Sequence, residues 1–260
     1  MEWSFETSEP VEADVVVPAG MVEIGPASTG QLHVELQPID PTSRRAAAAV
    51  AVAEVTCNAG KLRVHVPDRA GRNEVRCRIQ LPEGSSVSSK TASADLRCAV
   101  ALSGFSGATA SGDVLLGNVE GHLTFKSASA DLRCDTVGGR LAVRTASGDV
   151  SVNLARDVID ASLASGDFTV GEAATSVEIK SASGDVSVRR ASSGRVRVQT
   201  ASGDVSIGVA SGVGARLDVT TISGETTCAL PFQEEAPATA ALDIVCRTVS
   251  GDVRIESAER

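Results

Sequence analysis

Apolar and polar residues alternate in short runs along most of this chain. Residues 141–145 read Leu-Ala-Val-Arg-Thr, residues 150–153 read Val-Ser-Val-Asn, and Ala-Ser-Gly-Asp lies between them. A period of two residues is typical of a β-strand with one buried face. Ser, Gly and Asp favour turns. The pattern therefore predicts two short strands joined by a tight turn.

This unit recurs, and each copy carries the same turn phrase: Ser, then Gly or Ala, then an acidic residue. The nine acidic residues of the phrase are spaced 18, 18, 18, 18, 18, 19, 21 and 27 residues apart. A near-constant period indicates a solenoid, in which each repeat buries its apolar face against its neighbours. We therefore expect an all-β fold, a single-stranded parallel β-helix or β-solenoid with about nine coils of roughly 18 residues. The crossover rule predicts that the coils wind right-handed.

The turn phrase supplies our candidate site residues, a structural turn column in which equivalent residues stack from coil to coil. Its members are Ser93, Asp95, Ser111, Asp113, Ser129, Asp131, Ser147, Asp149, Ser165, Asp167, Ser183, Asp185, Ser202, Asp204, Ser223, Glu225, Ser250 and Asp252. Their oxygens can accept backbone N–H groups at the corner, and glycine permits a positive φ there. Stacked carboxylates repel one another, so we expect backbone amides or neighbouring cations to offset the repulsion. The candidate cations are Lys90, Lys126, Arg144, Lys180 and Arg247.

A column of carboxylates is also a candidate calcium site. Calcium-binding β-rolls use a nonapeptide repeat with a Gly-Gly pair. Here the period is twice as long and the glycine pair is missing. We therefore predict that the column caps turns and binds no metal, and we expect no other cofactor.

The two ends of the chain depart from the repeat. Residues 1–88 lack the turn phrase but keep alternating patterns, so we predict an irregular β N-terminal part that caps the solenoid. Strands are expected at 11–17, 21–24, 32–36, 50–55, 62–66 and 75–81, with a loop or one helical turn at 40–49. Residues 89–260 are predicted to hold the repeats, in one continuous β stack with the first part. Charged residues such as Arg254 and Glu256 are expected to protect the final strand from edge pairing.

Charge and composition narrow the classes of partner. The net charge of −9 and the pI of about 4.9 argue against binding to nucleic acid. No signal-peptide pattern opens the chain, and no run approaches the roughly 18 apolar residues of a membrane span. We therefore expect no membrane insertion and a cytoplasmic location; a surface location would require a leader.

The six cysteines form no C-x-x-C pair, so they are expected to be reduced and mostly buried, with Cys98, Cys134, Cys228 and Cys246 at apolar strand positions.

The phrase Thr-Ala-Ser-Gly-Asp-Val-x-(Val/Ile), at 145–152 and again at 200–207, resembles that of the bacterial putative-adhesin family, a group of β-strand repeat proteins of unknown function. Residues 5–7 (Phe-Glu-Thr) and 15–20 (Val-Val-Val-Pro-Ala-Gly) are similar to those of intracellular actinobacterial members. The resemblance extends over nearly the whole chain. It implies the β-repeat fold and no particular activity, because no activity defines the family.

The residues argue for a binding role and against catalysis. His33, His65 and His122 stand near no nucleophile motif, and the repeated Ser-Gly-Asp lacks the G-x-S-x-G form of a nucleophile elbow. We expect a non-catalytic scaffold or protein-interaction module with an unknown protein partner, as a monomer or with weak self-association. An adhesin-like surface protein or a carbohydrate-binding protein is the alternative. A β-helix enzyme acting on polysaccharides is weaker, because aromatic residues make up 2 % of the chain and tyrosine is missing.

Overall fold

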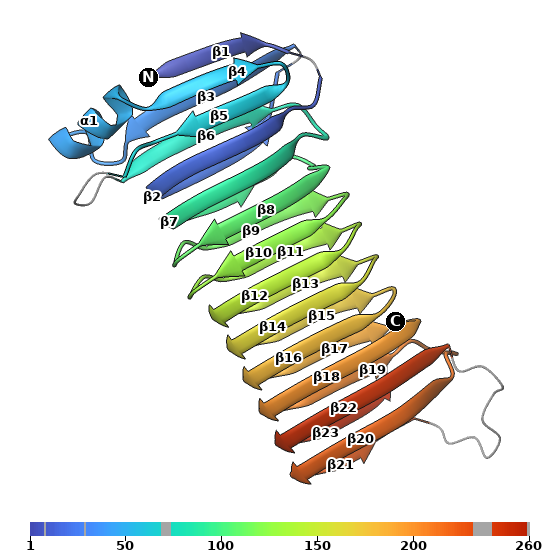
Figure 1. Ribbon diagram of the computed structural model, residues 1–260. Helices are drawn as coiled ribbons and strands as arrows, with labels where there is room; N and C mark the ends of the chain where they lie inside the picture. The colour runs from blue at the N-terminus through green and yellow to red at the C-terminus, as the bar shows by residue number, and fades with distance from the viewer. Residues whose placement is uncertain (8, 29, 69–73, 231–240, 259–260) are drawn as a thin grey trace. The chain divides into compact units, whose positions relative to one another are not determined.

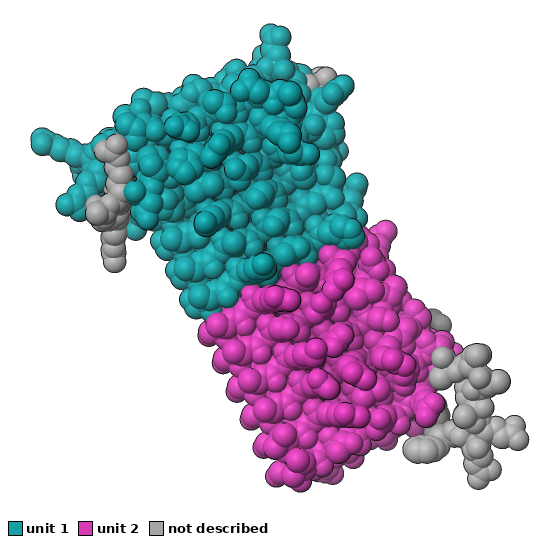
Figure 2. Space-filling model, viewed as in Figure 1, with its two compact units in different colours: residues 1–134 teal, residues 135–260 magenta. Residues whose placement is uncertain are grey.

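The computed structural model describes residues 1–7, 9–28, 30–68, 74–230 and 241–258. The chain forms two compact units, unit 1 at residues 1–134 and unit 2 at residues 135–260 (Figures 1 and 2). Short β-strands and one short helix build the described part, so the predicted all-β class is confirmed. The domain boundary that we placed at residue 88 stays a prediction.

Unit 1 holds the first ten strands and the helix. Their bounds are β1 (Glu2–Glu6), β2 (Glu12–Pro26), β3 (Gln31–Pro38), α1 (Arg44–Ala51), β4 (Glu54–Asn58), β5 (Lys61–His65), β6 (Val75–Leu81), β7 (Ser86–Cys98), β8 (Gly104–Thr109), β9 (Val114–Val119) and β10 (Leu123–Ser127). The next strand, β11 (Leu132–Val137), begins in unit 1 and ends in unit 2.

Unit 2 holds the remaining strands. They are β12 (Leu141–Ser147), β13 (Val150–Ala155), β14 (Ile159–Ser165), β15 (Phe168–Ala173), β16 (Val177–Ser183), β17 (Val186–Ala191), β18 (Gly194–Ser202), β19 (Val205–Val209), β20 (Ala215–Ser223), β21 (Thr226–Cys228), β22 (Leu242–Ser250) and β23 (Val253–Ser257).

Each repeat of unit 2 forms one coil of two strands with the turn phrase between them. We call the strand before the phrase the leading strand and the strand after it the trailing strand. Leading strands pair in parallel with leading strands, as β16 does with β14 and β18, and trailing strands pair with trailing strands. Alternate residues point inward, so that Val177, Val196 and Phe168 are buried. This arrangement confirms the predicted parallel β-solenoid.

The coil pattern begins earlier than the turn phrase does. Strand β2 pairs in parallel with β7 along both of their halves, and Gly20 lies opposite Ala94 with a φ of +116°. The Pro-Ala-Gly of residues 18–20 therefore makes the same corner as a turn phrase. On its other side β2 pairs in parallel with β5 and β6, which form one further coil.

The remainder of unit 1 closes this end with a different pairing. Strand β4 pairs antiparallel with β5, β3 pairs antiparallel with β6, and β1 pairs antiparallel with β3. The predicted strand at 50–55 is wrong, because residues 44–51 form helix α1 and β4 begins only at Glu54. Alanine has the highest helix propensity, and the Oγ of Ser43 accepts the N–H of Ala46 as an N-cap, at 3.2 Å.

The last coils of unit 2 do not stack in chain order. Strands β22 and β23 lie between the β18–β19 coil and the β20–β21 coil (Figure 1). The C-terminal strand is therefore an interior strand, and the expectation that Arg254 and Glu256 protect a final edge is wrong. The expected burial of Cys228 is wrong for the same reason: Cys228 is exposed on β21, whose coil is paired on one side only in the described part.

Candidate functional site

The acidic residues of the turn phrase form a ladder of hydrogen bonds within each unit. The backbone N–H of the acidic residue in one coil donates to the Oδ1 of the equivalent aspartate in the adjacent coil. The accepting aspartates are Asp95, Asp113, Asp149, Asp167, Asp185, Asp204 and Asp252. The N···O distances are 2.8 Å for Asp185 to Asp167, 2.8 Å for Asp204 to Asp185 and 2.9 Å for Asp252 to Asp204. Unit 1 repeats the contact from Asp113 to Asp95, at 3.1 Å. Each of these carboxylates satisfies a backbone donor that the corner would otherwise leave unpaired.

Lys180 is the candidate cation with an ion pair in the described part of the chain, and its partner lies outside the turn column. Lys180 pairs with Glu178 on its own strand, at 2.9 Å, and no ion pair joins Lys180 to Asp185. Arg133, which is not one of the candidate cations, lies 3.7 Å from Asp131. In the described part of the chain, no group of three or more His, Cys, Asp or Glu side chains could hold a metal ion. The absence of a metal from the column stays a prediction.

The middle residue of the phrase has two conformations. In unit 2 it is glycine with a positive φ, as at Gly184 (φ +119°), where an added Cβ would overlap the carbonyl oxygen of Gly166. In unit 1 two of the three positions are Ala94 and Ala130, which are buried and do not have a positive φ. Alanine is therefore accepted only where the backbone of the corner does not require glycine.

The three histidines lie on β3, on β5 and directly before β10. The Nδ1 of His33 is 3.0 Å from the Oγ of Ser4, and the Nδ1 of His65 is buried without a hydrogen-bond partner. His122 is exposed on the outer face of unit 1. The Ser4–His33 contact lies at the exposed surface of β1 and β3.

The cysteines are free, and four of the six are buried. Burial raises the pKa of Cys77 and of Cys246 to about 12, and that of Cys98 to about 11, because a thiolate loses its hydration in the apolar core. Burial also raises the pKa of Cys57. Buried thiols with raised pKa values are unreactive.

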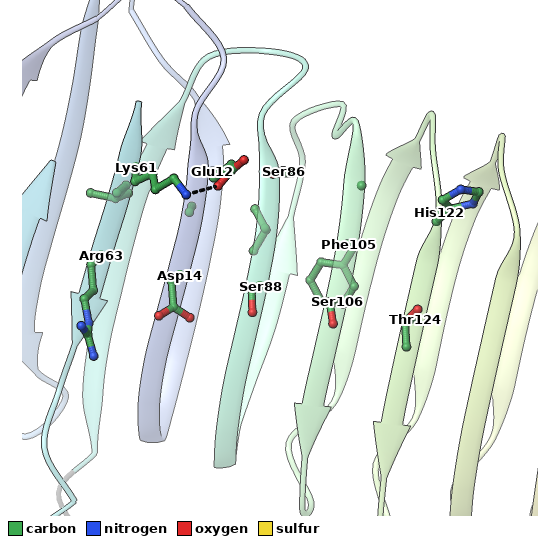
Figure 3. Close-up of a pocket in the computed structure, with 14 residues that line it drawn as sticks. Glu12, Asp14, Lys61, Arg63, Ser86, Ser88, Phe105, Ser106, His122 and Thr124 are labelled. Atoms are coloured by element: carbon green, nitrogen blue, oxygen red, sulfur yellow. Dashed lines mark ion pairs between the residues drawn. The ribbon is translucent and has the colours of Figure 1, made fainter. Parts of the chain in front are cut away.

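The outer face of unit 1 carries a hollow of about 620 Å³ over the leading strands β5, β2, β7, β8 and β10. We call it the trough. Two rows of outward side chains cross these strands in register. One row is Lys61, Glu12, Ser86, Gly104 and His122, and the other is Arg63, Asp14, Ser88, Ser106 and Thr124 (Figure 3).

Differences in side-chain size along these rows make the trough. Its floor is Ser86, Ser88, Gly104 and Ser106 on β7 and β8, where the side chains are short or missing. One wall is the charged surface of β2 and β5, and the other is His122 with Thr124. From β2 to β10 there are three strand spacings, about 14 Å in all. This width leaves room for one extended chain lying on the sheet.

The charged wall is exposed and internally paired. Lys61 Nζ lies 3.2 Å from Glu12 Oε2, and both side chains are more than two-thirds exposed. Glu12 and Asp14 are both exposed, so their charged groups face solvent. The wall is therefore suited to binding polar groups.

Part of the trough could have been recognised in the sequence. Ser86, Gly104 and His122 are spaced by 18 residues, so they are neighbours in any 18-residue solenoid. The charged wall gives no such signal, since Glu12 and Lys61 lie outside the repeat and meet only because β2 pairs with β5.

Helix α1 has eight residues, and the described part holds no helix with the length and hydropathy that a membrane crossing needs.

A search of curated proteins finds no match. A solved structure described as a putative adhesin from Bacteroides fragilis is 13% identical, with 98% of this chain and 97% of that chain covered and a TM-score of 0.46. A structure described as a putative lipid binding protein from Parabacteroides distasonis is 11% identical, with 100% and 96% covered and a TM-score of 0.39. The family model described as Toastrack DUF4097 matches residues 21–256, and the chain therefore belongs to this family.

Proposed function

We propose that this protein is a non-catalytic interaction module that binds an extended segment of a partner protein in the trough. The observation that carries the proposal is the floor of small residues on β7 and β8 between two taller walls. Solenoids present regular surfaces of this kind to their partners. The serine hydroxyls of the floor can donate or accept hydrogen bonds along a bound chain.

The wall residues favour a polar partner. Lys61, Arg63, Glu12 and Asp14 offer two charges of each sign to side chains of the bound segment. Phe105, the aromatic residue of the lining, is only 3% exposed and points into the core, so it offers no ring face to a sugar. This feature favours a peptide over a carbohydrate, the alternative that the sequence left open.

Gly104 allows a direct test. A Cβ added there would lie 3.6 Å from the nearest atom, the carbonyl oxygen of His122, and the backbone has no positive φ. Gly104→Arg therefore fills the trough without disturbing the coil. Gly117 on the trailing strand β9 is a matched control, because its added Cβ would lie 3.7 Å from the carbonyl oxygen of Cys98.

The experiment compares proteins captured from native lysate by the wild type and by the two variants, using quantitative mass spectrometry. A partner held by the wild type and by Gly117→Arg but lost with Gly104→Arg supports the trough as the binding site. If Gly104→Arg retains every partner of the wild type, the proposal fails. Circular dichroism checks that both variants keep the β signal.

We also propose that the protein works in the cytoplasm. The free thiols support this location, because a reducing compartment keeps cysteines unpaired. Fractionation of native cells with an antibody against the chain tests it, and recovery in the envelope or medium would contradict it.

A further inference from the structure

Four arginines gather on the outer face of the leading sheet in unit 2. Arg195 and Arg197 lie on β18, Arg247 lies on β22, and Arg216 lies on β20. With Leu217, Asp218, Asp243 and Val245 they line a hollow of about 490 Å³, which we call the arginine notch. The chain as a whole has a net charge of −9, so the arginine notch has the opposite sign to the net charge of the molecule.

Val245 lies at the centre of the arginine notch. In the strand register its neighbours are Arg197 on β18 and Asp218 on β20. With strands about 4.8 Å apart and alternate residues about 6.6 Å apart, all four arginine backbones lie within about 8 Å of Val245. An arginine side chain is long enough to span most of that distance. The guanidinium groups can therefore converge above the short valine side chain.

The charge of the lining is not balanced within the fold. Arg195 pairs with Asp243 at 2.9 Å. Arg197, Arg216 and Arg247 have no ion pair with another described residue, and Asp218 is the one other carboxylate of the lining. Four arginines and two aspartates leave a net charge of +2.

The order of the last coils produces this arrangement. If the coils stacked in chain order, β20 would lie next to β18 and Asp218 would stand at the centre. Because β22 lies between them, Val245 takes the centre and Asp218 moves to the outer strand. The inserted coil thus replaces a central carboxylate with an apolar floor.

We propose that the arginine notch binds a phosphate dianion, either free or as a phosphate monoester. A phosphate monoester carries a charge of about −1.5 to −2 at neutral pH and has three acceptor oxygens. Its oxygens point in several directions, as the surrounding arginines require, and guanidinium groups donate paired hydrogen bonds to phosphate. The arginine notch lies in unit 2 and the trough lies in unit 1. The two sites share no residues, so a failed test of one proposal does not contradict the other.

Calorimetric titration of the full chain at low ionic strength tests the proposal with two probes. One is inorganic phosphate and the other is a short neutral peptide with one phosphoserine, with the unphosphorylated peptide as its control. We expect both phosphate probes to bind and the unphosphorylated peptide not to bind. Tighter binding of the phosphopeptide would identify a phosphorylated partner as the source, whereas equal affinity would identify the phosphate group alone.

Variants locate the binding. Arg197→Gln and Arg216→Gln should each weaken binding about tenfold, the value of one charge-assisted hydrogen bond. Arg254→Gln is the matched control, because Arg254 is an exposed arginine on the trailing strand β23. All three residues are at the surface, so the variants should keep the wild-type melting temperature. No binding of either phosphate probe at millimolar concentration, or equal losses in Arg254→Gln and Arg216→Gln, would overturn the proposal.

Discussion

The ladder of aspartates makes a quantitative prediction about stability. Asp185 Oδ1 accepts the backbone N–H of Asp204 at 2.8 Å, and Asp185→Ala removes that acceptor. Asp185→Asn keeps an oxygen at the same place without the charge. Glu225 ends the ladder: its own N–H is bonded to Asp252, at 2.8 Å, and no coil follows it in the described part.

The expected cost of Asp185→Ala is about 1 kcal/mol. A buried amide left without a partner would cost more, but Asp204 is exposed, so water can replace part of the lost bond. Removing one carboxylate also relieves repulsion from Asp167 and Asp204, which keeps the net cost near this value. In a domain of this size, about 1 kcal/mol lowers the melting temperature by roughly 2–4 °C.

Circular dichroism measures the melting temperatures of the wild type and of the three variants under one condition. We expect Asp185→Ala to melt lower by this amount, while Asp185→Asn and Glu225→Ala melt close to the wild type. If Asp185→Asn loses as much as Asp185→Ala, the charge and not the hydrogen bond matters. Equal losses at Asp185 and Glu225 would refute the argument from the ladder, since the two carboxylates differ in having a following coil.

Four further outcomes are expected from the same structure. Adding Ca²⁺ or EDTA should leave the melting temperature unchanged, because a cation that bound only the folded column would raise it. Gly184→Ala should cost about 1–3 kcal/mol from backbone strain alone, measured by urea unfolding, whereas Gly104→Ala should be nearly neutral. A thiol reagent should modify Cys228 rapidly in the native protein and leave Cys77 and Cys246 unmodified. Burial raises the pKa of these two thiols from 9.0 to about 12, so the unfolded chain releases their protons first and stability should fall as pH rises across that interval. Cysteines that react equally when native, or a flat stability profile there, would contradict the burial.

The strands and corners of the repeats could be predicted from the local sequence of one repeat. The alternation in residues 141–145 and 150–153, together with the 18-residue spacing, predicted a strand on each side of the turn phrase and which side chains point inward. Such predictions succeed because side chains alternate between faces along a strand, and because equal repeats stack in register. The corner chemistry was also predictable in kind, since acidic residues at a turn can accept backbone amides.

Long-range pairing was decided by the tertiary structure. The sequence of residues 12–26 does not indicate which strands they pair with, namely β5 and β6 on one side and β7 on the other. The spacings of 21 and 27 residues showed only that the last repeats are irregular. They did not show that β22 lies between β18 and β20, because a strand can form its hydrogen bonds with either neighbour in a stack of similar coils.

Both proposed sites depend on that long-range pairing. The trough needs Glu12 and Lys61 beside the serines of the repeat, and the arginine notch needs Val245 between Arg197 and Asp218. The sequence by itself determined the strands, their inward faces and the corners, since these follow from interactions within one repeat. Only the tertiary structure decided which outward side chains stand next to each other, since strand order depends on competition among similar edges.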